Sequence, residues 1–210
     1  MLLKNLINNL KYKIGNEKIK GISLDSRNIK KGDVFVSIKG NRFDGNRYIE
    51  QAISRGAKTV IYSGSLKKKY KKVKLIKVKD TKSKLAEICS KYYKKKPKNI
   101  IAVTGTNGKT SVSDFFHQIF TLQKKQVGSL GTLGFKKNNH LKQRELTTLD
   151  SLNLNKDLYE MKKSNIDNVI IEASSHGLRQ KRLDFLNIKA GIFTNLSHDH
   201  LDYHKNMKDY

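Results

Sequence analysis

Short apolar runs alternate with amphipathic stretches along the chain. Runs rich in Ile and Val, such as residues 34–38 and 168–173, have the length and β-branched content of buried strands. Stretches such as residues 81–93 place apolar side chains at helical spacing, which predicts a helix with one buried face. Strands that alternate with helices are typical of a mostly parallel sheet that binds ligands at the carboxyl ends of its strands. The pattern therefore predicts an α/β fold.

The pattern divides into two domains near the single proline. Residues 94–98 read Lys-Lys-Lys-Pro-Lys, which ends the helical spacing and predicts a boundary. We expect a small α/β domain at residues 1–97 and a second domain at 98–210. In the first domain we expect strands at 22–24 and 34–38 around a turn, further strands at 59–62 and 74–78, and helices at 48–55 and 81–93. In the second we expect strands at 99–103, 127–130, 168–173 and 190–194 and helices at 112–120 and through 152–161.

The most informative stretch joins the strand at 99–103 to the helix at 112–120. Its sequence, Thr-Gly-Thr-Asn-Gly-Lys-Thr-Ser at 104–111, contains two glycines, a lysine and a hydroxyl. Glycines let successive N–H groups point into one concavity, the lysine adds positive charge, and the new helix directs its dipole to the same place. Val103 stands where a full phosphate-loop motif has its first glycine. The strand before and the helix after favour a phosphate-binding loop over a plain structural turn.

Acidic and imidazole side chains follow two later strands, and we expect these strands, which precede Glu172 and His200, to be neighbours in the sheet. Glu172 ends the run at 168–173, and a carboxylate in this place is how phosphate-loop enzymes hold Mg²⁺. Residues 198–204 read His-Asp-His-Leu-Asp-Tyr-His, which could suggest zinc, but a cysteine partner is lacking. Mg²⁺ held by one carboxylate and by phosphate oxygens is more typical here. Spacing alone leaves open whether a histidine is a ligand.

The chain is strongly basic, with a net charge of +26 over 210 residues. Such a charge suggests nucleic acid or an anionic membrane, but the lysines are scattered through nearly every segment, which favours a general compositional bias. We keep a basic phosphate-loop nucleic-acid-binding protein as the competing function from another class. The single cysteine, Cys89, excludes an internal disulfide, and its place on an apolar helix face indicates packing. No run reaches the ~18 apolar residues of a membrane span, and residues 1–15 do not resemble a signal peptide, so we expect a cytoplasmic protein without a membrane partner.

Two polar patches in the first domain lie where loops are expected. Residues 24–27 read Leu-Asp-Ser-Arg, and residues 40–45 read Gly-Asn-Arg-Phe-Asp-Gly. Loops at strand ends hold ligands, but Gly, Asn and Asp also favour plain turns. The residues alone do not decide between the two.

Six motifs in order resemble the Mur ligases, and within them the type that adds the third residue to UDP-N-acetylmuramoyl-dipeptide. They lie at residues 24–27, 31–35, 40–45, 104–110, 172–178 and 193–204, so the resemblance covers nearly the whole chain. It implies a UDP-sugar-binding domain at 1–97 and a central ATP-binding domain at 98–210. It also implies that the central domain is truncated, with the family's carbamylated lysine and its amino-acid-binding domain lying beyond Tyr210.

The resemblance also implies roles for individual residues. Lys109, Glu172 and His200 would be catalytic, with Thr110, Glu172 and His200 holding Mg²⁺. The ATP-binding residues would be Gly105, Thr106, Asn107, Gly108, Lys109, Thr110 and Ser111. The residues in contact with the UDP-muramoyl peptide would be Leu24, Ser26, Asn41, Arg42, Phe43, Thr147, Thr148, Ser174, Gln180 and Arg182. The chain departs from the family at Leu149, where proline is common after the paired threonines.

The implied reaction is an ATP-dependent ligation in peptidoglycan precursor synthesis. The D-glutamate carboxylate of the substrate would form an acyl phosphate, which the incoming amino acid would displace, with meso-diaminopimelate favoured over lysine. The partners would be UDP-N-acetylmuramoyl-dipeptide and an amino acid, with ATP and Mg²⁺ as cofactors and no nucleic acid. The nearest alternatives are other ligases of the superfamily, either the one that adds the terminal dipeptide or a folylpolyglutamate synthase.

Overall fold

The computed structural model describes residues 1–7, 16–40, 44–66, 68, 70–71 and 73–210. The chain forms two compact units, Met1–Tyr92 (unit 1) and Tyr93–Tyr210 (unit 2), which are described separately below. The division falls at the end of a helix, a few residues before the boundary expected at Pro97. Within the described ranges, no helix combines the length and apolar character needed to cross a membrane.

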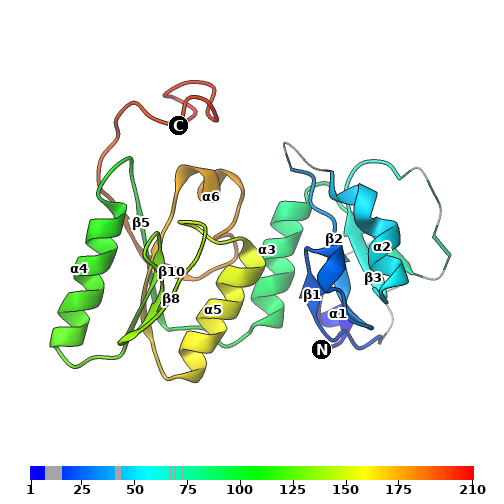
Figure 1. Ribbon diagram of the computed structural model, residues 1–210, viewed down its shortest axis with the longest axis horizontal. Coiled ribbons are helices and arrows are strands. Elements are labelled where there is room, and N and C mark those ends of the chain that lie inside the picture. Colours follow the sequence, from blue (N-terminus) through cyan, green and yellow to red (C-terminus); the bar gives the residue numbers. More distant parts are fainter. Residues whose placement is uncertain (8–15, 41–43, 67, 69, 72) are drawn as a thin grey trace. The chain divides into compact units, whose positions relative to one another are not determined.

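Unit 1 is built on a four-stranded parallel sheet (Figure 1). Its strands lie in the order β1 (Ile22–Ser23), β2 (Val34–Val36), β3 (Thr59–Tyr62) and β4 (Lys74–Lys77). The helices are α1 (Leu3–Leu6), α2 (Ile49–Ser54) and α3 (Thr81–Tyr92), with 3₁₀ turns η1 (Ser26–Asn28) and η2 (Gly45–Tyr48). Phe35, Ile49 and Val60 join strands and α2 in a buried core. β1 and β2 pair in parallel, because the segment between them includes η1 and brings the chain back to the same end of the sheet.

Unit 2 is built on a six-stranded sheet in the order β10-β5-β9-β6-β7-β8. The first four strands are parallel: β10 (Ile188–Phe193), β5 (Asn99–Thr104), β9 (Asn168–Glu172) and β6 (Val127–Gly131). β7 (Gly134–Lys137) and β8 (His140–Lys142) continue it as an antiparallel hairpin. The helices are α4 (Lys109–Leu122), α5 (Ser151–Lys163) and α6 (Ser175–Arg179).

The sequence analysis did not predict the β7–β8 hairpin, because β8 is exposed along its whole length and therefore shows no apolar pattern. The hairpin turns at Asn138, whose φ of +50° is a left-handed conformation that asparagine tolerates. The Asn138 Oδ1 accepts a hydrogen bond of 3.1 Å from Val127 N, which ties the turn to the start of β6.

The strand order corrects one expectation. Glu172 and His200 were expected to follow neighbouring strands, but β5 lies between β9 and β10. Crossover connections in parallel sheets often pass over a strand that is already in place, so strands consecutive in sequence need not be adjacent.

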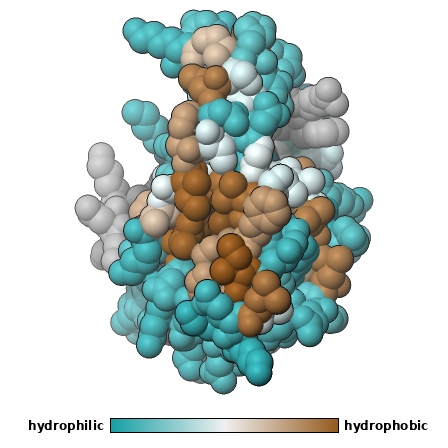
Figure 2. Space-filling view, turned by 90° about the vertical axis from the view of Figure 1, so that its left-hand side faces the viewer, coloured by the Kyte–Doolittle hydropathy of each residue, from teal (hydrophilic) through white to brown (hydrophobic). Residues whose placement is uncertain are grey.

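The sheet of unit 2 is covered by α4 on one face and α5 on the other (Figure 1). Leu154, Leu158 and Met161 of α5 are fully buried against Val169 and Ile171 of β9. On the outer side of α4, by contrast, Phe115 is 60% exposed and Leu122 is 82% exposed. Figure 2 views the molecule from the side on which α4 lies, and hydrophobic residues form a broad area on it. α4 therefore exposes apolar side chains on its outer side and buries the polar residues Ser113 and His117, unlike a typical surface helix.

One carboxylate is buried in the apolar face of α5. The Asp157 side chain is 1% exposed, and its Oδ1 accepts a hydrogen bond from Nη2 of Arg144, in the loop before the helix. The other oxygen, Oδ2, is buried and has no partner among the described residues. Burial raises the pKa of Asp157 to about 6, although the charge of Arg144 acts in the opposite direction.

The raised pKa of Asp157 predicts how the free energy of unfolding depends on pH. Because the pKa of Asp157 is higher in the folded state than the unfolded value of about 3.9, the folded protein binds more protons between about pH 4 and 6. The stability of the wild type relative to Asp157→Asn should therefore decrease as the pH rises from about 4 to about 6, by no more than about 3 kcal/mol, and stay constant above about pH 7. Urea unfolding of both proteins across this range measures it. Glu50→Gln, which removes an exposed carboxyl of unit 1, is the control, and a difference for Asp157→Asn that is independent of pH would contradict the assignment.

Candidate active site

The loop between β5 and α4 has a backbone that requires its glycines. Gly105 and Gly108 have φ values of +134° and +84°, which side chains rarely adopt. A Cβ at Gly105 would lie 2.1 Å from the Thr194 Oγ1 and 2.8 Å from the Asn195 carbonyl oxygen. Lys109 begins α4 directly after the loop, so the helix N-terminus faces the same concavity. The predicted strand–loop–helix arrangement is therefore present.

The segment after β10 supports this loop. Asn107 N donates to Asn195 Oδ1 at 3.0 Å, and Thr106 N donates to the Asn195 carbonyl at 3.0 Å. Thr194 Oγ1 donates to the Asn107 carbonyl at 2.6 Å. The sequence analysis had not assigned this role to Thr194 and Asn195, although their place directly after a parallel strand was a usable signal. These hydrogen bonds hold the loop against the segment that follows β10.

Lys109 lies over the loop that it follows. Its Nζ donates to the carbonyl oxygens of Gly105, at 2.6 Å, and Thr106, at 2.8 Å. The loop borders a cavity of about 290 Å³. The cavity is lined by the loop and by Thr132, Thr147, Ser174, Ser175, His200 and Tyr210. An anion in this cavity would meet backbone N–H groups, a helix N-terminus and an ammonium group, a combination that binds phosphate.

Glu172 is buried beside this cavity and fully hydrogen-bonded. It is the last residue of β9 and 1% exposed. Its Oε2 accepts from Thr110 Oγ1 at 2.9 Å and from Thr132 Oγ1 at 3.1 Å, and its Oε1 accepts from Thr132 N at 3.0 Å. At Gly131, a Cβ would lie 2.0 Å from Glu172 Oε1, so only glycine leaves room for the carboxylate.

The oxygen atoms around Glu172 suit a hard divalent cation. The hydroxyls of Thr110 and Thr132 both lie within hydrogen-bond distance of the Glu172 carboxylate, and Mg²⁺ prefers oxygen ligands of this kind together with phosphate. Thr132 had not been predicted, although it directly follows β6, as Glu172 ends β9. Across the described ranges, no three His, Cys, Asp or Glu side chains are grouped as they would be around a metal ion.

His200 lines the same cavity as Thr110 and Thr132. Its φ of +54° is left-handed, and its ring packs edge-on against His176 with centroids 4.9 Å apart. His176 in turn stacks on Tyr203 at 4.0 Å. Burial lowers the pKa of His176, and the neighbouring imidazoles add to the effect. The imidazole of His200 therefore belongs to an aromatic cluster that borders the cavity.

The loop before α5 carries two threonines, of which Thr147 lines the cavity and Thr148 is buried beside it. Thr147 lines the cavity, and its Oγ1 lies 3.0 Å from Thr132 Oγ1. Thr148 is buried, and its hydroxyl donates to the Glu172 carbonyl at 2.7 Å and accepts from Ser174 N at 2.9 Å. Leu149, the departure from the family pattern, is buried in the core of unit 2. Packing of Leu149 and bonding of Thr148 therefore fix the end of the loop without a proline.

The remaining residues expected near the substrate are Ser174, Gln180 and Arg182, which lie close to this loop. Ser174 lines the cavity and caps α6 through its Oγ. Arg182 donates to the Thr148 carbonyl and, through Nη2, to Gln180 Oε1 at 2.9 Å. Gln180 Nε2 donates to the Tyr203 hydroxyl at 3.2 Å. Gln180 and Arg182 thus contact the loop and the 198–204 segment, whereas Thr147 and Ser174 border the cavity itself.

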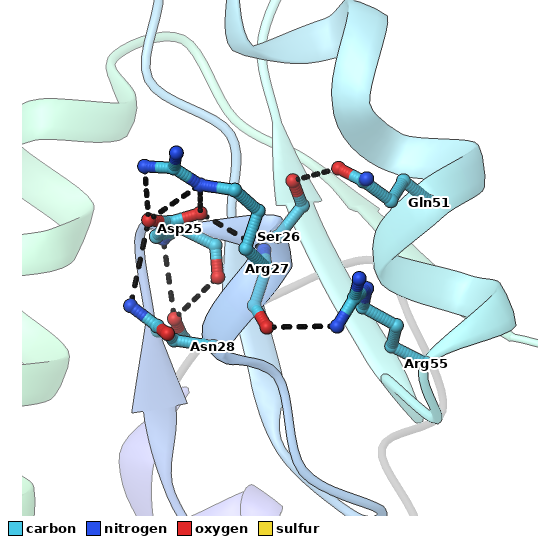
Figure 3. Close-up of polar contacts among 7 residues, drawn as sticks. Asp25, Ser26, Arg27, Asn28, Gln51 and Arg55 are labelled. Carbon is cyan, nitrogen blue, oxygen red and sulfur yellow. Dashed lines mark hydrogen bonds and ion pairs between the residues drawn. The ribbon is translucent and has the colours of Figure 1, made fainter.

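A second cavity, of about 530 Å³, lies within unit 1. It is lined by Leu24, Asp25, Ser26, Arg27, Phe35, Ile38, Gly45, Tyr48 and Gln51. Ser26 Oγ donates to Gln51 Oε1 at 2.5 Å, and Asp25 accepts from the Arg27 side chain, as Figure 3 shows. The Arg27 guanidinium lowers the pKa of the half-buried Asp25 carboxyl. The patch at 24–27 therefore lines a pocket, and the contribution of Gln51 had not been predicted. The expected residues Asn41, Arg42 and Phe43 lie outside the described residues.

Comparison with known proteins places this geometry in a family. Residues 103–210 match the Mur ligase middle domain, and residues 18–93 match the Mur ligase family catalytic domain. A UDP-N-acetylmuramoyl-L-alanyl-D-glutamate–2,6-diaminopimelate ligase from Rickettsia montanensis is 43% identical over 206 residues, which are 96% of this chain and 43% of that protein. A ligase of the same description, numbered 2, from Clostridium acetobutylicum is 37% identical and matches all of this chain but 45% of that protein.

A solved structure of a UDP-N-acetylmuramoyl-L-alanyl-D-glutamate–2,6-diaminopimelate ligase superposes on the whole chain with a TM-score of 0.86 at 29% identity, covering 43% of that protein. The chain thus spans less than half the length of the relatives it matches. Because the middle-domain match alone extends over half of its residues, the chain belongs to the Mur ligase family.

Proposed function

We propose that this chain binds ATP and UDP-N-acetylmuramoyl-L-alanyl-D-glutamate for a ligase that adds meso-diaminopimelate to the dipeptide. One observation carries the proposal. The phosphate loop, Thr132 and Thr147 line a single cavity, and Thr132 also bonds to the buried carboxylate of Glu172 beside it. A ligase of this kind has to bring a nucleotide phosphate and an acceptor carboxylate together at one point.

The residues of the chain supply the binding and orientation for this reaction. The D-glutamate carboxylate attacks the γ-phosphorus of ATP, ADP leaves, and the amino group of the incoming amino acid then displaces phosphate from the acyl phosphate. Lys109 and the loop N–H groups hold the phosphates and offset the repulsion between two anions. Thr110, Glu172, Thr132 and His200 would hold Mg²⁺, which supplies charge neutralisation at the phosphates. Leu24 and Ser26 would hold the uridine end in the cavity of unit 1.

The binding test uses UDP-N-acetylmuramoyl-L-alanyl-D-glutamate in isothermal titration with the chain. We expect saturable binding that UMP competes for, and weaker binding by Ser26→Ala, because Ser26 lines the unit 1 cavity. A matched control is Ser54→Ala, whose hydroxyl bonds within α2 and is not among the cavity residues. A basic nucleic-acid-binding protein would instead bind DNA with an affinity that falls by roughly 0.9 log units per phosphate contact per decade of salt. Salt-dependent DNA binding without uridine-nucleotide binding would refute the proposal.

The second test concerns Lys109. We expect Lys109→Ala to weaken ATP binding by roughly ten- to a hundredfold, because a hydrogen bond to a charged group contributes about 1.5–3 kcal/mol. Lys156→Ala, an exposed lysine on α5, should bind ATP like the wild type. Circular dichroism shows whether each variant is folded, and a folded Lys109→Ala protein with wild-type affinity would contradict the assigned role.

The third test concerns the metal. Glu172→Gln removes the only anionic group of the Thr110–Glu172–Thr132 cluster, so we expect ATP binding to need a higher Mg²⁺ concentration. His200→Ala should shift the requirement in the same direction, and Glu160→Gln should leave it unchanged. ATP titrations at a series of Mg²⁺ concentrations measure the shift. The same Mg²⁺ dependence in all four proteins would rule out the metal assignment.

A further inference from the structure

The loop that carries Thr147 is held by side chains. It runs from Gln143 to Asp150, between the end of β8 and the start of α5, and has no regular structure. At its end, the hydroxyl of Thr148 is bonded to β9 and Ser174, and Leu149 is buried. At its start, Arg144 forms the ion pair with Asp157. Thr147 lies between these two anchors.

The Arg144–Asp157 pair contains the most buried carboxylate among the ion pairs of the described residues. The side chains are 20% and 1% exposed, whereas those of Lys68 and Glu50 are 65% and 68% exposed. Both members also keep an unsatisfied buried atom, Nε of Arg144 and Oδ2 of Asp157, within the described part of the chain. Removing two charges from water costs several kcal/mol, and an incompletely hydrogen-bonded pair does not fully recover this cost. Stability alone therefore gives a weak reason for this pair.

The ion pair also fixes the start of the loop, because Asp157 holds Arg144 at a defined place on α5. Asp150 caps the helix through Leu152 N and Asn153 N, and Asp157 lies seven residues later, which is two turns or about 10 Å along the axis. The loop therefore ends at the first turn of α5 and starts two turns further along it. Only Glu145 and Leu146 separate Arg144 from Thr147, so the place at which Arg144 is held limits where Thr147 can lie in the cavity.

We propose that Arg144 and Asp157 are positioning residues that hold the start of the 143–150 loop on α5 and so place Thr147 at the acceptor end of the phosphate cavity. The inference rests on the proposed function, because the ligand that Thr147 would meet is the muramoyl-dipeptide part of the UDP substrate. The planar guanidinium directs its N–H groups in fixed directions, which suits a role in orientation better than an ammonium group would.

The experiment replaces the pair by apolar side chains, Arg144→Met together with Asp157→Leu. Buried pairs replaced in this way often keep or gain stability, so urea unfolding should give a free energy at least equal to that of the wild type. UMP, which tests only the unit 1 cavity, should bind as before. The affinity for UDP-N-acetylmuramoyl-L-alanyl-D-glutamate should fall about tenfold, and the amides of residues 145–147 should exchange hydrogen faster. The control is Lys162→Met, which removes the cation of a more exposed ion pair at the far end of α5 and should change neither the affinity nor the exchange.

The outcomes separate the two proposals. A stable double variant that binds the dipeptide ligand like the wild type overturns the positioning role and leaves the proposed function intact. If the wild-type chain does not bind the dipeptide ligand, the proposed function is wrong, and the ligand assigned here to Thr147 is wrong with it. If the double variant does not fold, Arg144→Lys takes its place, since it keeps the charge and loses the planar geometry. Weaker dipeptide-ligand binding with unchanged UMP binding then supports the positioning role, and unchanged binding of both refutes it.

Discussion

The carboxylate of Glu172 joins the carboxyl ends of three strands. It ends β9, bonds to Thr110 in the first turn after the β5 loop, and bonds twice to Thr132 after β6. A buried carboxylate without partners would be strongly destabilising, so these bonds determine which residues have to lie around it. Gly131 leaves the space, and the two threonines supply the donors. The cavity at the edge of the sheet lies beside this group, and Thr110 and Thr132 line it.

Hydrogen bonds between distant segments hold the rest of the site. The loop between β5 and α4 is bonded to Thr194 and Asn195, and the Thr147 loop is bonded to the ends of β6 and β9. Each loop therefore depends on strands that it does not itself connect. Such loops keep a defined conformation at the surface of the sheet, because backbone groups that lack a partner within the loop find one on a neighbouring strand.

Charge has different effects in different parts of this protein. Most of the lysines lie at the surface, and an exposed pair such as Lys68–Glu50 contributes about 1 kcal/mol or less. Asp157 differs, because burial raises its pKa and its ion pair lies beside the loop of the candidate site. The net charge of +26 therefore says less about how the chain works than the few charges that are buried.

The sequence by itself determined the elements whose causes are local. The apolar run of β5, the glycines of the loop and the start of α4 follow from residues adjacent in the chain, and the family motifs located the same stretch. The roles of Thr132, Asn195 and Gln51 depended on tertiary structure, because their partners lie far along the chain. Thr132 bonds to a carboxylate 40 residues away, and Asn195 supports a loop 88 residues away. The β7–β8 hairpin and the place of β5 between β9 and β10 also became clear only from the tertiary structure. Strand pairing uses backbone groups that every residue carries, so side-chain patterns indicate which segments are strands but not which strands are neighbours.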